Sequence, residues 1–140
     1  MSSELRFDVL VLGGGGAALR AALSACEQGA KTAILSKGEA GKSGATYYSV
    51  AEVGAFNVPD GALDPEDSPE EFYRDMEMAA LGTAQLPLCR ILAEQAESAL
   101  QYLEKISGGT VFAKEDGHFK VYQACFSTRP RSHAVSYTHL

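Results

Sequence analysis

The stretch Asp8-Val9-Leu10-Val11-Leu12-Gly13-Gly14-Gly15-Gly16-Ala17-Ala18 decides the fold, because an apolar strand runs into a glycine turn and then into a helix. The turn fits the pattern G-x-G-x-x-A, in which the glycines allow a tight turn and a close approach of phosphates to the main chain. The first amides of the helix and the helix dipole then face the anion. We therefore predict that a dinucleotide pyrophosphate binds at Gly13, Gly14, Gly15, Gly16, Ala17 and Ala18.

The residues on both sides of the turn complete a βαβ unit over residues 6–37. Residues 7–12 are almost all apolar, as in a parallel strand that is covered on both faces. An alanine-rich helix is expected after the turn, ending near Gly29, with Cys26 as a small buried packing residue. Residues 31–36 predict the second parallel strand, at the spacing of a dinucleotide-binding fingerprint. The predicted fold class is α/β, with a Rossmann-like parallel sheet that is incomplete because only two such strands are recognisable.

A long loop and a helical pair follow this unit. Residues 38–60 are rich in small residues and predict a long ordered loop, which is uncommon unless the loop has a function. A helix is expected over residues 69–80, with Asp67 or Ser68 as its N-cap and proline in its first turn. Apolar residues at steps of three and four predict a second, amphipathic helix over residues 88–106.

The last third of the chain predicts a β-hairpin and an irregular end. Residues 110–113 and 118–122 are expected to pair around Asp116-Gly117, so that residues 66–122 form a helical and hairpin part. In Arg129-Pro130-Arg131-Ser132-His133, two arginines beside a histidine suit carboxylate binding or acid–base chemistry. We expect a solvated basic turn there instead, because the sequence identifies no partner for these side chains. His118 is expected to be an exposed strand residue.

Composition excludes several classes of function. The chain has 140 residues, 46% of them apolar, and a net charge of −6, so it has no basic footprint for nucleic acid. Its three cysteines are widely spaced, which argues against a disulfide framework and a zinc site and favours a reducing, cytoplasmic location without any metal. No apolar run approaches the ~20 residues of a transmembrane segment.

The end of the second strand bears on the identity of the nucleotide. An NAD-binding unit usually has Asp or Glu there to bind the ribose hydroxyls, whereas this chain has Ser36 and Lys37. Ser36 can bond a ribose hydroxyl, Lys37 adds positive charge near the phosphates, and Glu39 is a weaker substitute for the acid. An NAD(P)-binding dehydrogenase domain and a non-catalytic nucleotide-binding module both remain open as alternatives.

Several motifs resemble the flavoproteins of succinate dehydrogenase, fumarate reductase and L-aspartate oxidase. Residues 13–22 look like the opening motif of that family, and Leu35-Ser36-Lys37-Gly38 is similar to its strand-end signature. Gly44-Ala45-Thr46-Tyr47-Tyr48 is similar to the flavin loop of aspartate oxidase, with a one-residue insertion after Lys37. Residues 67–72 match the Asp-Ser-Pro-Glu segment, and the likeness covers residues 6–122. The chain departs from the family at Ser49-Val50-Ala51-Glu52, where members have Ala-Gln-Gly-Gly.

The resemblance implies an FAD-dependent oxidoreductase that transfers a hydride between FAD and a small dicarboxylate or amino acid, with an electron-transfer partner. It implies non-covalent FAD, because Gly44 stands where membrane-bound members carry the histidine that bonds to the flavin. The cofactor is then expected along Ser36, Lys37, Ser43, Gly44, Ala45 and Thr46. By the same layout, the chain is the first part of an FAD-binding domain and has no turnover of its own. We expect the capping domain to be missing from it and the catalytic residues to lie beyond residue 140. Residues 134–140 are expected to form a non-native tail, because the last six residues do not continue the family pattern.

Overall fold

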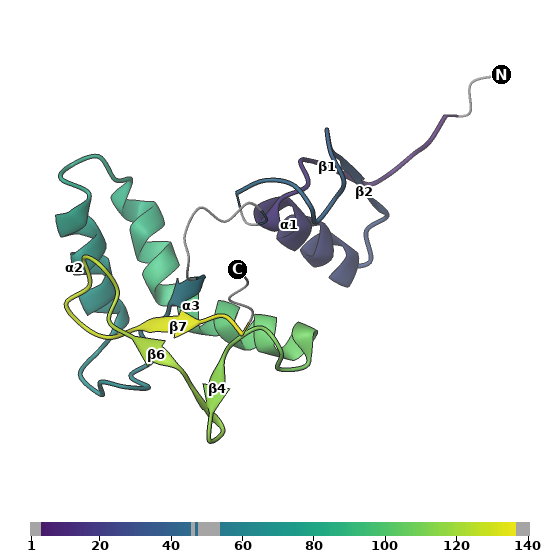
Figure 1. The fold of residues 1–140 in the computed structure, drawn as a ribbon. Helices are drawn as coiled ribbons and strands as arrows, with labels where there is room; N and C mark the ends of the chain where they lie inside the picture. The colour runs from purple at the N-terminus through teal and green to yellow at the C-terminus, as the bar shows by residue number, and fades with distance from the viewer. Residues whose placement is uncertain (1–3, 46, 48–53, 137–140) are drawn as a thin grey trace. The chain divides into compact units, whose positions relative to one another are not determined.

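The chain divides into two compact units in the computed structural model, which describes residues 4–45, 47 and 54–136. The first unit is Met1–Ala51 and the second is Glu52–Leu140. Figure 1 shows the helices and strands of each unit.

The first unit is the predicted βαβ unit. Strand β1 (Val9–Leu12) leads through the glycine turn into helix α1 (Gly16–Glu27), and strand β2 (Thr32–Leu35) returns beside β1. The two strands are parallel, with Val9 opposite Thr32 and Leu12 opposite Leu35. Helix α1 packs on both strands. The predicted α/β class with a parallel sheet is therefore confirmed, and each strand is shorter than the sequence suggested.

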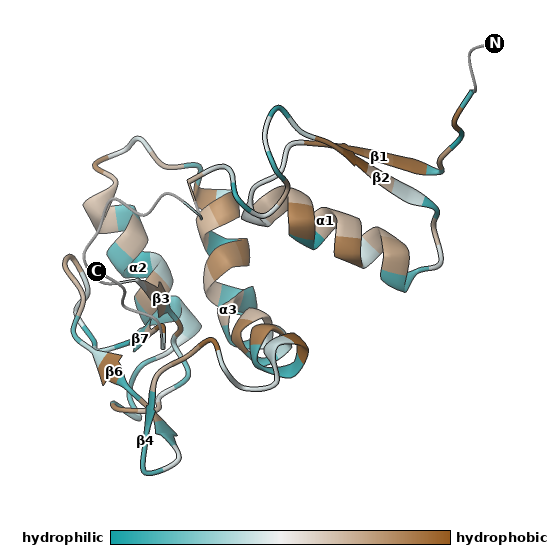
Figure 2. Ribbon diagram, turned by 45° about the vertical axis from the view of Figure 1, so that its right-hand side comes forward, coloured by the Kyte–Doolittle hydropathy of each residue, from teal (hydrophilic) through white to brown (hydrophobic). Residues whose placement is uncertain are grey.

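One face of the β1–β2 pair is open in the described part of this unit. Leu10, Leu12 and Leu35 are 58%, 73% and 62% exposed, although Figure 2 shows β1 as hydrophobic along its length. The prediction that both faces of β1 are covered is thus wrong for these residues, because α1 lies on one side and is the only helix in the described part of the unit. Cys26 is also exposed, where the sequence predicted a buried packing residue.

The second unit has a helical pair beside an antiparallel sheet. Helices α2 (Pro69–Ala79) and α3 (Leu86–Ser107) pack together, and Ser68 is the N-cap of α2. Strand β7 (Ser132–Ala134) lies between β3 (Ala55–Asn57) and β6 (Val121–Tyr122) in the sheet. The core joins α3 to the residue after β3 and to the segment that follows α3, and it consists of Val58, Ala96, Leu100 and Phe112. The two predicted helices are confirmed, and α3 extends beyond both of its predicted ends.

The hairpin turn is confirmed, but the predicted strand pairing is confirmed only in part, since the Lys120 amide donates a 2.9 Å hydrogen bond to the Ala113 carbonyl. Strands β4 (Lys114–Glu115) and β5 (His118–Phe119) pair around Asp116 and Gly117, so the first strand begins where the turn was expected. Phe112 instead bridges to Val135, and β6 pairs with β7. The reason is that β7 supplies the hydrogen bonds that a local hairpin was expected to provide. His118 is exposed, as predicted.

The expected solvated turn at residues 129–133 is also wrong. The side chains of Arg131 and His133 are fully buried, with an exposed fraction of 0%. Carboxylates from residues 60–75 hold both side chains, and no local sequence pattern reveals partners so far away in the chain. Ala134 and Val135 are buried as well, so this part of residues 134–140 is packed into the unit. The non-native origin of that tail stays a prediction.

Candidate functional site

The glycine turn presents main-chain amides at the start of α1. The Gly13 amide donates a 2.8 Å hydrogen bond to the carbonyl of Leu35, which fixes the turn on the end of β2. Gly15 is the N-cap of α1, and no side chain caps the helix or adds an acid to its first turn. The amides of Gly16, Ala17 and Ala18 have no partners within the helix, as at any α-helix start. They can therefore donate to an anion, which the helix dipole also favours.

Gly14 is the most constrained position of the turn. A Cβ atom there would lie 2.5 Å from Ser36 Oγ and 2.8 Å from Ser43 Oγ. Ser36 follows β2 and Ser43 belongs to the next loop, so both hydroxyl groups converge on the turn. The structure thus brings together three residues that the sequence predicted for one site. At Gly13 the constraint is the backbone, because its φ is +126°, whereas a Cβ there would make only an ordinary contact of 3.6 Å with Ala18 Cβ.

The loop after β2 folds back over the glycine turn. The Gly41 amide donates a 3.0 Å hydrogen bond to the Gly14 carbonyl. Gly44 has a φ of +83°, and a Cβ there would lie 3.1 Å from Gly15 Cα. Any side chain at position 44 would therefore be both strained and crowded against the turn. Of the remaining predicted residues, Ala45 is exposed next to Gly44, and Thr46 lies outside the described residues.

These elements enclose a groove of about 670 Å³ within the first unit. It contains Ser36, Lys37 and Ser43 but no acidic residue; its full lining is Leu12, Gly13, Gly14, Leu35, Ser36, Lys37, Gly38 and Ser43. Glu39, the weaker candidate for the missing acid at the end of β2, is not among these lining residues and forms an ion pair of 2.9 Å with Lys42. The groove therefore offers hydroxyl, amide and ammonium donors to a ligand.

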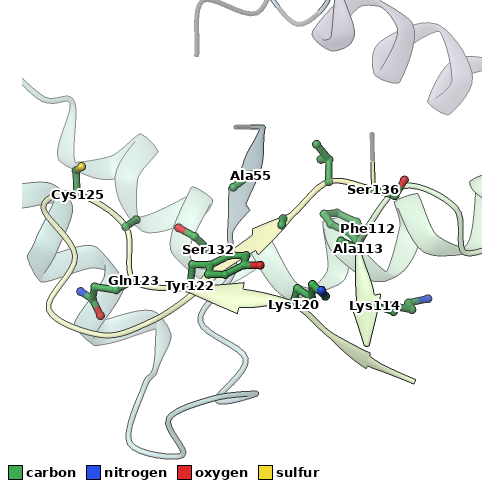
Figure 3. A pocket seen from close by; sticks show the side chains of 13 residues that line it. Ala55, Phe112, Ala113, Lys114, Lys120, Tyr122, Gln123, Cys125, Ser132 and Ser136 are labelled. Carbon is green, nitrogen blue, oxygen red and sulfur yellow. The ribbon is translucent and has the colours of Figure 1, made fainter. Parts of the chain in front are cut away.

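A larger cavity of about 930 Å³ lies in the second unit, where β3, β6 and β7 meet the segment around Phe112. Figure 3 shows Lys114, Lys120 and Tyr122 among its lining side chains. Lys114 is paired with Glu104, and Lys120 with Glu115 at 3.5 Å, so both ammonium groups are already neutralised. The sequence did not indicate this cavity, because its walls come from segments far apart in the chain. Nothing in its lining specifies a ligand.

A buried charge network, defined here as Arg131, Asp67 and Asp75, also lies in the second unit. The Arg131 guanidinium donates to Asp67 at 2.7 to 3.2 Å and to Asp75 at 2.5 Å. Burial by itself raises the pKa of Asp75, but hydrogen bonds from Thr128 and Arg131 outweigh it, and the pKa lies below its ordinary value. The network holds β7 on the start of α2 and lines none of the cavities described above.

Two further features are excluded for the described part of the chain. No cluster of three His, Cys, Asp or Glu side chains there could hold a metal ion. Among the same residues, no helix combines the length and the apolar character needed to span a bilayer.

Comparison with known proteins points to flavin binding. The family model described as "FAD binding domain" matches residues 8–139. A fumarate reductase (CoM/CoB) subunit from Methanothermobacter marburgensis is 40% identical over 118 residues, which are 83% of this chain and 20% of that protein.

Two solved structures of Sdh1 from Mycobacterium smegmatis have the same fold. The complex with UQ1 matches at a TM-score of 0.76 and 26% identity, over 89% of this chain and 20% of the other. The apo form of the complex matches at a TM-score of 0.79 and 26% identity, over 92% of this chain and 21% of the other. These matches confirm the likeness to succinate dehydrogenase and fumarate reductase flavoproteins. The chain spans about a fifth of the length of the proteins it matches.

Proposed function

Because the chain belongs to the FAD binding domain family, we propose that its glycine turn, residues 13–18, binds the pyrophosphate of FAD. The observation that carries the proposal is the packing of Gly14 against the hydroxyl groups of Ser36 and Ser43, which leaves no room for a Cβ. The turn is thereby held close to β2, and the amides at the start of α1 face an anion without competition from an acidic side chain.

The loop after β2 extends this site. Ser36 and Lys37 lie where the ribose of a dinucleotide is expected, and Ser43 offers a hydroxyl beside the phosphates. Gly44 and Ala45 leave the approach to the turn free of large side chains, and Thr46 is proposed as a further hydroxyl donor from the sequence alone. The FAD family match favours this assignment over an NAD(P)-binding dehydrogenase domain.

We propose that FAD is held without a covalent bond. The backbone at position 44 supports this, because Gly44 has a positive φ and lies directly against Gly15. A histidine could not occupy this position without displacing the turn. Acid precipitation of the loaded protein should therefore release all of its flavin into the supernatant, and flavin retained in the pellet would contradict non-covalent binding.

For the complete protein, we propose an oxidoreductase acting on a small dicarboxylate or amino acid, within a complex that contains an electron-transfer partner. Bound FAD would supply the centre that exchanges a hydride with the substrate. The residues described above would bind and orient the cofactor. Support comes from the names of similar proteins, which are a fumarate reductase in one case and an Sdh1 complex that holds UQ1 in the other. A cytoplasmic location stays a prediction, and the described residues include no assigned catalytic group.

FAD titration of this chain, followed by flavin fluorescence and calorimetry, tests the proposed site. We expect a one-to-one complex and a loss of affinity of about tenfold or more in Gly14→Ala, because the added methyl group displaces both hydroxyls. Gly29→Ala is the matched control, since its φ is +83° but nothing lies within 4 Å of the added atom. That variant should lose stability and keep its FAD affinity. Equal affinity losses in the two variants would contradict the proposed site.

A further inference from the structure

The charge of the groove in the first unit comes from the residues at the end of β2. The groove is lined there by Ser36, Lys37 and Gly38, and none of its eight lining residues is acidic. Lys37 is exposed, and within residues 4–45, 47 and 54–136 no carboxylate forms an ion pair with it. The ammonium group is therefore available to an anion that enters this end of the groove.

Two other lysine side chains of the first unit lie outside the groove. Lys42 is engaged by Glu39 at 2.9 Å, and Lys31 lies over the ring of Phe7 at 5.2 Å. Neither residue lines the groove. Lys37 is thus the cationic side chain that belongs to the groove itself.

The charge at this position has a known chemical consequence in dinucleotide sites. A carboxylate at the end of the second strand accepts hydrogen bonds from the ribose 2′-hydroxyl and repels a 2′-phosphate. A cation at the same place accommodates the 2′-phosphate instead. This chain has a neutral hydroxyl donor and an ammonium group there, so the repulsive element is missing.

We propose that the groove at Ser36 and Lys37 accepts adenine nucleotides with a 2′-phosphate, so that such nucleotides compete for the FAD site. The phosphate pairs with the Lys37 ammonium, and Ser36 donates to one of its oxygens. The proposal rests on the proposed function, since it takes the ribose of the bound nucleotide to lie at the end of β2.

Calorimetric titration with ADP and with 2′-phosphoadenosine 5′-diphosphate, each alone and in competition with FAD, tests the proposal. In the unmodified chain, the 2′-phosphorylated nucleotide should bind about threefold more tightly than ADP or better. In Lys37→Gln this preference should disappear. In Lys37→Glu it should reverse to about tenfold in favour of ADP, because like charges then face each other. Lys31→Gln removes the same charge outside the groove and should keep the preference.

Salt provides an independent readout. Raising the ionic strength from about 0.1 M to about 1 M shortens the Debye length from about 10 Å to about 3 Å, so the preference should shrink while ADP binding persists. If ADP competes with FAD and the 2′-phosphorylated nucleotide binds no more tightly than ADP, the proposal is overturned and the FAD site stands. A preference that survives in Lys37→Gln would also overturn it. If FAD binds and neither smaller nucleotide competes with it, the proposal fails and the FAD site stands. If FAD does not bind either, the proposed function fails as well.

Discussion

Arg131 supplies the positive charge of the buried charge network in the second unit. Its guanidinium is fully buried and faces two buried carboxylates, those of Asp67 and Asp75. Burying these charges is costly, and the cost is offset only while the hydrogen-bonded fork is complete. The packing of β7 against the start of α2 therefore depends on an intact buried charge network.

Arg131→Ala should lower the free energy of unfolding by about 3 to 5 kcal/mol, because two buried carboxylates lose their cation. Arg131→Lys should recover part of this loss, since an ammonium keeps the charge but cannot form the planar fork. Urea unfolding followed by circular dichroism measures both changes. Arg129→Ala serves as a control, because Arg129 and its partners Asp64 and Glu66 are more exposed, and it should cost much less. Equal losses at positions 129 and 131 would contradict the role of burial.

Asp75 gives the same network a dependence on pH. Burial opposes the ionised form of Asp75, but hydrogen bonds from Thr128 and Arg131 lower its pKa below the ordinary value of 3.8. A lowered pKa contributes stability that is present above the unfolded value and is lost as the pH falls through the folded value. Urea midpoints should therefore drop steeply below about pH 4, and less steeply in Asp75→Asn. An identical acid profile in the two proteins would show that this group does not contribute.

At the level of elements, residues close in sequence determine where α2 begins. Ser68 Oγ accepts a 3.3 Å hydrogen bond from the Glu71 amide, Pro69 is the first helical residue, and two glutamates lie in the first turn. Ser68→Ala should cost about 1 kcal/mol of stability, since one amide at the helix start loses its acceptor. Ser98→Ala is the control, because the Ser98 hydroxyl bonds only to the Gln95 carbonyl within α3 and is exposed. Thermal unfolding should show a lower midpoint for Ser68→Ala alone.

The contrast between α2 and β7 shows how far sequence reasoning reaches. Caps, glycine stops and apolar periodicity are local, so α1, α2, α3 and the glycine turn could be predicted. β7 contains Ser132 and His133, polar residues that are buried because their partners lie elsewhere in the chain: Asn57 for Ser132, and Asp60, 3.0 Å away, for His133. No local pattern distinguishes such a strand from a solvated turn. The pairing of Phe112 with Val135 and of β6 with β7 was missed for the same reason. The closeness of Ser43 to Gly14 also became visible only in the fold.

At the level of the whole molecule, the two units differ in how many apolar residues they bury: among the described residues, Ala22 is the one in the first unit, and the others belong to the second. The first unit has a two-stranded sheet with an open face, and pairs of strands are only marginally stable alone. The second unit has a core around Ala96, Leu100 and Phe112. Local opening is easier where few apolar contacts are lost. The amides of the first unit should therefore be less protected from exchange than those of the second.

Amide hydrogen exchange measures this difference directly. Without a ligand, the amides of β1 and β2 should exchange faster than those around Ala93 and Ala96, which are 1% and 7% exposed within α3. Addition of FAD should slow exchange at Gly13 and along β1 and β2, because a ligand that binds only the folded unit stabilises it in proportion to RT ln(1 + [L]/Kd). Gly14→Ala should weaken this protection at the same FAD concentration, because its affinity for FAD is lower, and Gly29→Ala should retain it in full. Slow exchange in β1 and β2 before FAD is added would mean that the strands are stable without the cofactor.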